Sequence, residues 1–332
     1  MITSMKSVLI TGCAGFLGSH LAAHHLNSGD KVFGFDNFSS SRPTSKHLAA
    51  LMAHQSFKFQ NLDITDTSQF DSMCDMFNDN ELNQKFDLIY NFACPASPPR
   101  YQSIPIETML TCTLGVKNVL NLARVCGARV VHASTSEVYG NPQVSPQSEA
   151  YLGNVNSYGP RACYDAGKQA AEALCYDYLN KYNVDVRLVR IFNTYGPNMD
   201  PDDGRVISNL ISQALKGLPM TIYGDGSQTR SFCYVDDLIK GIVSLSELKQ
   251  NPGSPVNIGN PDEFTMLELA KIVAEKTYGG DPIIVFKKLP KDDPEQRLPD
   301  ITLAENLLGF KPTIMLEEGL ERTIEYFKCV TL

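Results

Sequence analysis

Short apolar stretches alternate with longer amphipathic ones along the first 192 residues of the chain. Runs of roughly four to eight apolar residues are typical of buried strands. They occupy residues 7–11, 31–35, 57–62, 86–92, 129–133 and 186–192. Stretches with helical spacing lie between them, around residues 107–125 and 164–180. This alternation predicts an α/β fold with a Rossmann-like, doubly wound parallel sheet and helices on both faces.

The regular alternation weakens after residue 192, which indicates a second domain. A helix is expected at about 206–216, a strand at 220–224, a helix at 265–279 and a strand at 283–289. Residues 231–248 are expected to form a strand and a helix that rejoin the main sheet, whereas 255–260 is placed in the second domain. We therefore expect a first domain at 1–192 plus about 231–250. A smaller, discontinuous C-terminal α/β substrate-binding domain would comprise 193–230 and 251–332.

Composition and charge restrict the functions that this fold could serve. The 332 residues are 43% hydrophobic with a formal net charge of -8, so neither nucleic acid nor an anionic membrane is an expected partner. No apolar run has the length of a membrane span, and residues 1–6 lack the order of a signal peptide. The nine cysteines stand singly, without metal-binding spacing. This predicts reduced thiols, no metal site and a cytoplasmic protein.

Three glycines follow the first predicted strand and mark a phosphate-binding turn. Gly12, Gly15 and Gly18 allow a tight turn, close approach of a pyrophosphate and close packing of the next helix. Asp36 ends the second strand, where its carboxylate can accept hydrogen bonds from ribose hydroxyls and would repel a 2′-phosphate. This predicts NAD as the cofactor, although Arg42 lies close enough in sequence to leave NADP open.

Further cofactor contacts are expected at the ends of the neighbouring strands. Asp63 ends the third strand and could receive the adenine amino group, or it could simply cap the strand. Residues close to these turns complete the expected set of cofactor contacts: Phe16, Leu17, Asn37, Ile64 and Ala93.

A tyrosine and a lysine four residues apart form the candidate catalytic pair. Tyr164 and Lys168 share one face of the predicted helix. An ammonium group beside a phenol favours the phenolate, which lowers its pKa and makes tyrosine a usable base near neutral pH. Thr135 follows the fifth strand, and its hydroxyl can hydrogen-bond the substrate oxygen that Tyr164 deprotonates. With the glycine turn, this order of motifs resembles that of the NAD-binding short-chain dehydrogenases.

A set of longer motifs extends over nearly the whole chain. They are TGCAGFLGSHL, ACPASPPRY, ASTSEVYGNP, NSYGPRACYDAGK, RIFNTYGP, DGRVISN, YGDGSQTRSFCYVDDL and DDPEQRLPD. On these residues the chain resembles the extended short-chain dehydrogenases that act on nucleotide sugars, and among them the UDP-glucuronate decarboxylases, also called UDP-xylose synthases. The segments PASPP, STSEVYG and GPRACYDAGK are the most specific, because sister families share the glycine turn and differ here.

The resemblance implies a carboxy-lyase reaction in which NAD is regenerated in each cycle. The 4-hydroxyl of UDP-glucuronate is oxidised, the 4-keto acid loses carbon dioxide, carbon 5 is protonated, and the hydride returns to carbon 4 to give UDP-xylose. Tyr164 would be the base of the first step and the acid of the last. Lys168 would tune Tyr164 and hold the nicotinamide ribose, while Thr135 would orient the 4-hydroxyl. Ser136 and Glu137 would contact the sugar and its carboxylate end.

Arg297 is the expected partner of the sugar carboxylate. By resemblance it binds this carboxylate and stabilises the developing enolate, whereas the plainer interpretation is an ion pair with Asp292, Asp293 or Glu295. The contacts to the rest of the substrate that the resemblance implies are Arg100, Tyr101, Asn193, Arg205, Asn209, Tyr223, Gln228 and Arg230.

Three alternative functions stay open on the sequence. A UDP-glucuronate 4-epimerase or an NDP-glucose 4,6-dehydratase would share the fold, NAD and the Tyr164/Lys168 pair. Ser136 disfavours the dehydratase, which normally has an aspartate here, and epimerases tend to have a smaller residue in place of Glu137. A non-catalytic NAD-binding protein should have lost Tyr164, Lys168 or Thr135, and all three are present. The resemblance also implies a homodimer that pairs the helices at about 106–125 and 164–179.

Four of the cysteines lie within or near the motifs. Cys112 stands where relatives usually have asparagine, and Cys13 stands where glycine or alanine is common. Cys94 occupies a position that varies among relatives, and Cys163 fits the family pattern. We expect no thiol chemistry from any of them.

Overall fold

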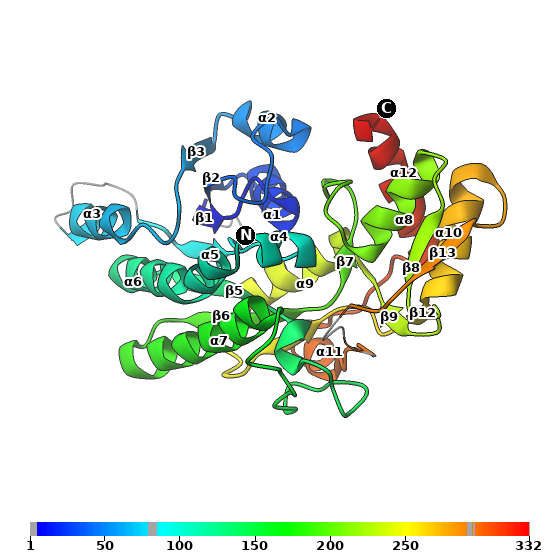
Figure 1. Ribbon diagram of the computed structural model, residues 1–332. Helices are drawn as coiled ribbons and strands as arrows, with labels where there is room; N and C mark the ends of the chain where they lie inside the picture. The colour runs from blue at the N-terminus through cyan, green and yellow to red at the C-terminus, as the bar shows by residue number, and fades with distance from the viewer. Residues whose placement is uncertain (1–4, 79–84, 291–293, 295, 332) are drawn as a thin grey trace.

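A seven-stranded parallel sheet forms the centre of the structure, a computed structural model that describes residues 5–78, 85–290, 294 and 296–331 (Figure 1). The strand order is β11-β6-β5-β4-β1-β2-β3, and all the pairings are parallel. The strands are β1 (Ser7–Thr11), β2 (Lys31–Asp36), β3 (Phe57–Asn61), β4 (Leu88–Asn91), β5 (Arg129–Thr135), β6 (Val186–Ile191) and β11 (Val256–Ile258). The predicted fold class is therefore confirmed.

The central strand β1 shows why the sequence contains short, continuous apolar runs. Every residue of β1 is buried. Val8 and Ile10 belong to one hydrophobic core, whereas Leu9 belongs to a second core on the opposite face of the sheet. Because successive side chains of a strand point to opposite faces, a strand covered on both sides has to be apolar throughout.

Helices cover both faces of the sheet. On one face lie α3 (Thr67–Asn78), α6 (Val116–Cys126) and α7 (Ala162–Tyr182), with α6 between the other two. On the other face α1 (Phe16–Asn27) contacts α9 (Val235–Glu247). The predicted helix at 107–125 consists of α5 (Pro105–Leu110), a π-helical turn η1 (Thr111–Gly115) and α6. Short helices follow the carboxyl ends of three strands: α2 (Lys46–Met52), α4 (Pro98–Ser103) and the 3₁₀ turn η2 (Ser136–Tyr139).

The second region contains three two-stranded sheets and lies beside the main sheet, to its right in Figure 1. β8 (Met220–Tyr223) pairs with β13 (Ile284–Lys287), β9 (Thr229–Ser231) with β12 (Glu263–Thr265), and β7 (Thr194–Tyr195) with β10 (Cys233–Tyr234). Its helices are α8 (Val206–Leu215), α10 (Met266–Tyr278) and α12 (Leu316–Thr331), whereas α11 (Thr302–Leu308), expected in the second domain, packs against β11 of the main sheet and against α9. The helices and strands predicted for this part of the chain are thus present. Within the described ranges, no helix is both long and apolar enough to cross a bilayer.

Two short strands differ from their predicted positions. β11 lies in the range assigned to the second domain, yet it pairs with β6 at the edge of the main sheet. β10 was expected to rejoin the main sheet, but it pairs with β7 instead, while α9 after it packs against that sheet. An apolar run of two or three residues cannot indicate which edge it joins, so periodicity alone could not place either strand. The remaining division into two domains stays a prediction.

Candidate active site

A cleft of about 1260 Å³ opens at the carboxyl ends of the parallel strands, and residues of both regions line it. Ligands of open α/β sheets bind at this end of the strands. The predicted site residues all line this cleft with the exception of Tyr101. The ring of Tyr101 is only 1% exposed and stacks in parallel on the ring of Tyr164, with centroids 4.9 Å apart. Tyr101 therefore supports Tyr164 rather than facing the cleft.

The glycine turn between β1 and α1 has no room for side chains. Gly12 has a φ of 73°, and a Cβ added there would lie 2.8 Å from the carbonyl oxygen of Phe92 and 2.9 Å from the Cα of Ala93. A Cβ on Gly18 would collide with the carbonyl oxygen of Gly12. Gly15 is the N-cap of α1 and offers no side-chain cap. The first amides of the helix are therefore available to an anion, as a dinucleotide site requires.

Asp36 connects the end of β2 to the glycine turn. Its Oδ2 accepts a hydrogen bond of 3.0 Å from the Ala14 amide. Its Oδ1 accepts hydrogen bonds from the Phe38 amide at 2.9 Å and from the Ser41 hydroxyl at 2.8 Å. The side chain is thus held in position at the wall of the cleft, where the sequence predicts a ribose contact.

Arg42, the residue because of which the sequence did not exclude NADP, forms ion pairs with residues of the second region. Its Nε and Nη2 donate to the two oxygens of Asp200 at 2.9 and 2.7 Å, and Nη2 also donates to Asp202 at 2.9 Å. These carboxylates belong to the loop that leads into α8. The guanidinium group is therefore directed at acidic side chains of the second region.

Asn37 and Asp63 form a hydrogen-bonded pair at the ends of β2 and β3. The Asn37 side-chain amide donates to Asp63 Oδ2 at 2.8 Å, and Asp63 Oδ1 accepts from the amide and hydroxyl of Thr65. Burial raises the pKa of Asp63, but these hydrogen bonds outweigh it and lower the pKa below the ordinary value. The carboxylate is thus ionised and able to accept a further hydrogen bond.

Tyr164 and Lys168 lie on one face of α7 and are both buried. The Lys168 ammonium donates to the carbonyl oxygen of Ala133 at 2.8 Å and lies 5.7 Å from the centroid of the Tyr164 ring. The hydroxyl of Tyr164 is hydrogen-bonded to Thr135, at the end of β5. The structure therefore brings the three predicted residues together.

The pKa of Tyr164 shifts in the opposite direction to the predicted one. Burial raises it well above the ordinary value, and Cys94 and Glu137 add to the increase, while the hydrogen bond with Thr135 lowers it. Desolvation dominates because the phenol is enclosed and the Lys168 ammonium is directed at a backbone carbonyl. The prediction of a lowered pKa is therefore wrong for this arrangement of side chains, in which Tyr164 is a neutral phenol.

Glu137 lies in η2 and forms the centre of a buried ion-pair cluster. Arg297 donates to both of its oxygens, at 2.7 and 2.6 Å, and Arg161 donates to Oε2 at 2.7 Å. Burial opposes ionisation of Glu137, but the two guanidinium groups outweigh it and lower the pKa to about 2. Arg297 therefore pairs with Glu137, whereas the alternative partners at 292, 293 and 295 lie outside the described residues.

Arg161 and Asp165 belong to this cluster and are absent from the sequence-based predictions. Arg161 Nε lies 3.6 Å from Asp165 Oδ2, and both side chains are buried. Burial and the charge of Glu137 raise the pKa of Asp165 to about 7 against the opposing effect of Arg161. A signal was present, because GPRACYDAGK places the two residues four positions apart around Tyr164.

The predicted contacts to the nucleotide line the wall formed by the second region. Arg205 pairs with Asp203, and Arg230 donates to the carbonyl oxygen of Pro294. Arg100, on the opposite side, lies 3.8 Å from Asp200. The remaining predicted contacts in this wall are Asn193, Asn209, Tyr223 and Gln228. The structure thus gathers these groups in the cleft.

A glycine turn hydrogen-bonded to the carboxylate that ends β2, with a buried tyrosine and lysine in the same cleft, defines an NAD-binding site of the short-chain dehydrogenase kind. Comparison with known proteins agrees with this class. Residues 8–259 match the NAD dependent epimerase/dehydratase family, and the chain belongs to that family. NAD, the cofactor that the sequence predicts, is thus the cofactor of the family.

Within the family, the chain is similar to curated UDP-glucuronic acid decarboxylases. It is 46% identical to UDP-glucuronic acid decarboxylase 1 of Xenopus tropicalis over 323 residues, which cover 97% of this chain and 72% of that protein. It is 44% identical to UDP-glucuronic acid decarboxylase 6 of Arabidopsis thaliana, covering 98% of this chain and 90% of the relative. The resemblance on which the sequence analysis relied is therefore confirmed.

A solved structure of similar fold comes from a sister enzyme. UDP-glucuronic acid 4-epimerase of Bacillus cereus, in complex with UDP-glucuronic acid and NAD, is 31% identical with a TM-score of 0.85. The alignment covers 98% of this chain and 99% of the epimerase. The two chains share the fold along their whole length, so the fold alone does not separate a decarboxylase from an epimerase.

Proposed function

We propose that this chain is an NAD-dependent carboxy-lyase that converts UDP-glucuronate to UDP-xylose through a 4-keto intermediate. The observation that carries the proposal is the bidentate Glu137–Arg297 pair, buried in the same cleft as Tyr164, Lys168 and Thr135. The similarity to UDP-glucuronic acid decarboxylases over nearly the whole chain supports the same reaction.

The residues around the glycine turn fit NAD. A side chain at Gly12 or Gly18 would collide with the neighbouring backbone, so only glycine leaves room at this turn. Asp36 is hydrogen-bonded to the Ala14 amide and would accept hydrogen bonds from a ribose. When bound, NAD accepts a hydride from carbon 4 of the sugar and later returns it. The residues that would hold it are Gly12, Gly15, Phe16, Leu17, Gly18, Asp36, Asn37, Asp63, Ile64, Ala93, Tyr164 and Lys168.

Tyr164 would move the proton of the 4-hydroxyl. Thr135 is hydrogen-bonded to Tyr164 and would orient the same hydroxyl group of the substrate. Because burial keeps Tyr164 protonated, a cationic group close to the ring would favour the phenolate needed for the first step. The resulting phenol is then the proton donor of the last step, so one residue would act in both directions.

The ion-pair cluster has two guanidinium groups that could bind a glucuronate carboxylate. Arg161 and Arg297 bring two positive charges, and Glu137 brings one negative charge. With its pKa at about 7, Asp165 is partly protonated at neutral pH. The two guanidinium groups are therefore suited to bind a further carboxylate. When this carboxylate leaves as carbon dioxide, its bonding electrons move to the 4-keto oxygen beside Tyr164 and Thr135.

The nucleotide would bind along the wall of the second region. Arg205 and Arg230 supply guanidinium forks suited to a diphosphate, and Arg205 would exchange its contact with Asp203 for phosphate oxygens. The other residues proposed to contact the substrate are Arg100, Asn193, Asn209, Tyr223 and Gln228. Tyr101 would have no direct contact with the substrate and would instead hold the ring of Tyr164 in place by stacking on it.

Product analysis tests the proposed reaction. Purified protein with UDP-glucuronate should form UDP-xylose and one equivalent of carbon dioxide. UDP-galacturonate would instead indicate the epimerase, and a lack of product would contradict all the proposed sugar chemistry. UDP-glucose serves as a matched control, because without the carboxylate it cannot lose carbon dioxide.

We also propose that the chain forms a homodimer in the cytoplasm. Exposed apolar side chains gather on the helices implied as the dimer contact, among them Ile106 on α5 and Tyr176 on α7, which are 71% and 65% exposed. All nine cysteines lie in the described residues and are free thiols, as is usual in a reducing compartment. Light scattering on the parent and on Tyr176→Glu tests the dimer, since the variant should dissociate. Imaging of a fluorescent fusion tests the location.

A further inference from the structure

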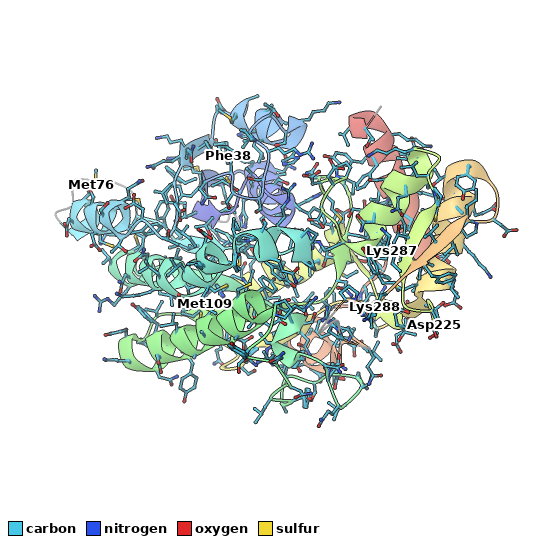
Figure 2. All side chains as sticks on the ribbon, viewed as in Figure 1. Phe38, Met76, Met109, Asp225, Lys287 and Lys288 are labelled. Carbon is cyan, nitrogen blue, oxygen red and sulfur yellow. The ribbon has the colours of Figure 1, made fainter. Side chains whose placement is uncertain are left out.

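Two cysteine sulfur atoms meet in the wall of the cleft. Cys94 follows β4 and lines the cleft directly after Ala93. Cys112 lies in the π-helical turn η1, three residues after Met109, whose side chain Figure 2 labels. The two Sγ atoms are 3.5 Å apart. Cys112 is buried, whereas Cys94 is half-buried, so the pair can be reached from the cleft through Cys94.

The two thiols have different acidity. The hydrogen bond from Cys112 lowers the pKa of Cys94 to about 7, and Lys168 adds to the decrease against the effect of burial. The same hydrogen bond and burial raise the pKa of Cys112. By contrast, burial raises the pKa of Cys13, Cys175 and Cys233. Since the thiolate is the nucleophile in thiol exchange, Cys94 is the attacking member of the pair.

We propose that Cys94 and Cys112 form a redox-modifiable dithiol beside the catalytic pair, which a small-molecule disulfide such as oxidised glutathione converts into an intramolecular disulfide. The Cys94 thiolate attacks one sulfur of the reagent and releases one thiolate. The Cys112 sulfur then attacks Cys94 and releases the second. Two cysteine thiols are oxidised, one reagent disulfide is reduced to two thiols, and the two cysteine protons end on the leaving thiolates.

The disulfide would disturb the predicted nicotinamide end of the cleft. The sulfur atoms have to approach from 3.5 Å to about 2.05 Å, which pulls the loop after β4 towards η1. This loop includes Ala93, whose Cα would meet any side chain at Gly12, and Cys112 packs against Gly167, next to Lys168. Because a shift of about 1 Å at a reacting centre is costly, turnover should fall by about tenfold or more.

Peptide mapping of the oxidised protein tests the disulfide without reference to any substrate. The parent protein, treated with oxidised glutathione at neutral pH and digested without reduction, should give a linked Cys94–Cys112 peptide with two hydrogens fewer. Dithiothreitol should restore the separate peptides. In Cys112→Ser, Cys94 should retain glutathione, whereas the control Cys175→Ser should behave as the parent. A parent without the linked peptide, or with glutathione retained on Cys94, would overturn the proposal.

The effect on turnover rests on the proposed function and is measured separately. UDP-xylose formation by the linked parent should fall by about tenfold and return after reduction. If the linked peptide forms and turnover stays unchanged, the inferred disturbance of the cleft is wrong while the dithiol stands. If the reduced protein forms no UDP-xylose at all, the proposed function fails and the peptide map still decides the dithiol.

Discussion

The wall of the cleft next to β1 and β2 is shaped by its backbone, whereas the wall formed by the second region is lined with charged side chains. In the first, called the cofactor wall, Gly12 and Gly18 exclude any side chain and Asp36 is fixed by the Ala14 amide. In the second, called the nucleotide wall, Arg205 contacts Asp203 and Arg230 contacts a backbone carbonyl. Under the proposed function, the cofactor wall is thus formed in advance, whereas the nucleotide wall would have to exchange internal contacts for ligand contacts.

This difference has a physical consequence for substitutions. A backbone-shaped site fails when an atom is added, because neighbouring carbonyl groups cannot move far in a packed interior. A site made of ion pairs fails when charge is removed, and the loss is smaller because water and neighbouring groups take over part of the role. Residues between the walls, around Tyr164 and Glu137, should show the largest effects.

Tyr164→Phe should have the largest effect, because it removes the proposed proton carrier. Turnover of UDP-glucuronate should fall by about 10²- to 10⁴-fold, with the affinity for NAD and the free energy of unfolding nearly unchanged. Steady-state kinetics, NAD titration and urea unfolding measure these three quantities. Tyr182→Phe, at the exposed end of the same helix and outside the proposed dimer contact, is the matched control. Full activity in Tyr164→Phe would refute the catalytic assignment.

Gly12→Ala should break the cofactor wall. The added methyl group meets the Phe92 carbonyl oxygen at a positive φ, so the free energy of unfolding should decrease by about 2 kcal/mol and NAD binding should weaken. Gly29→Ala is the control, since Gly29 also has a positive φ but no atom lies within 4 Å of an added Cβ. Thermal unfolding with and without NAD measures the difference. Equal losses in the two variants would contradict the proposed steric origin.

Arg205→Ala should weaken substrate binding at the nucleotide wall, with a smaller effect than the two substitutions above. Loss of a hydrogen bond to a charged ligand costs about 1.5 to 3 kcal/mol, so KM for UDP-glucuronate should rise by about tenfold or more. NAD affinity should stay unchanged, because Arg205 belongs to the other wall. Arg322→Ala, an exposed arginine on α12, is the control. An equal change in NAD affinity would show that the two walls are not independent.

Asp165→Asn should have the smallest effect on turnover. Its effect on the free energy of unfolding should depend on pH. The pKa of Asp165 is raised from 3.8 to about 7, so between these values the folded protein binds a proton that the unfolded chain lacks. The free energy of unfolding of the parent should therefore fall, relative to the variant, as pH rises through this window, by up to about 1 kcal/mol per pH unit. Urea unfolding at pH 5 and pH 7 measures the difference. A constant difference would mean that Asp165 does not titrate there.

The sequence predicts the cofactor wall better than the rest of the site. Strand, glycine turn and acidic residue are local features of β1, α1 and β2, so their spacing alone indicates the geometry. The pairing of Glu137 with Arg297 joins residues 160 positions apart, and it is a contact that no local pattern contains. The same limit explains β11, whose pairing with β6 joins residues far apart in the sequence, such as Val256 and Val189.

Two physical features of the site were beyond pattern analysis for another reason. The raised pKa of Tyr164 depends on how completely the ring is enclosed, and the stacking of Tyr101 beneath it contributes to that enclosure. The closeness of Cys94 and Cys112 depends on the π-helical turn, which widens the helix locally and changes the direction of the side chains around it. The spacing of residues along the chain indicates neither the enclosure of the Tyr164 ring nor the distance between the two cysteines.

The central claim is that one site oxidises carbon 4, releases the carboxylate and reduces the same carbon again. UDP-glucuronate that carries deuterium at carbon 4 tests this most directly. The claim predicts UDP-xylose that retains the deuterium at carbon 4, has gained one hydrogen from solvent at carbon 5, and forms without net accumulation of NADH. A product of six sugar carbons, or UDP-xylose that has lost its deuterium to water, would contradict it.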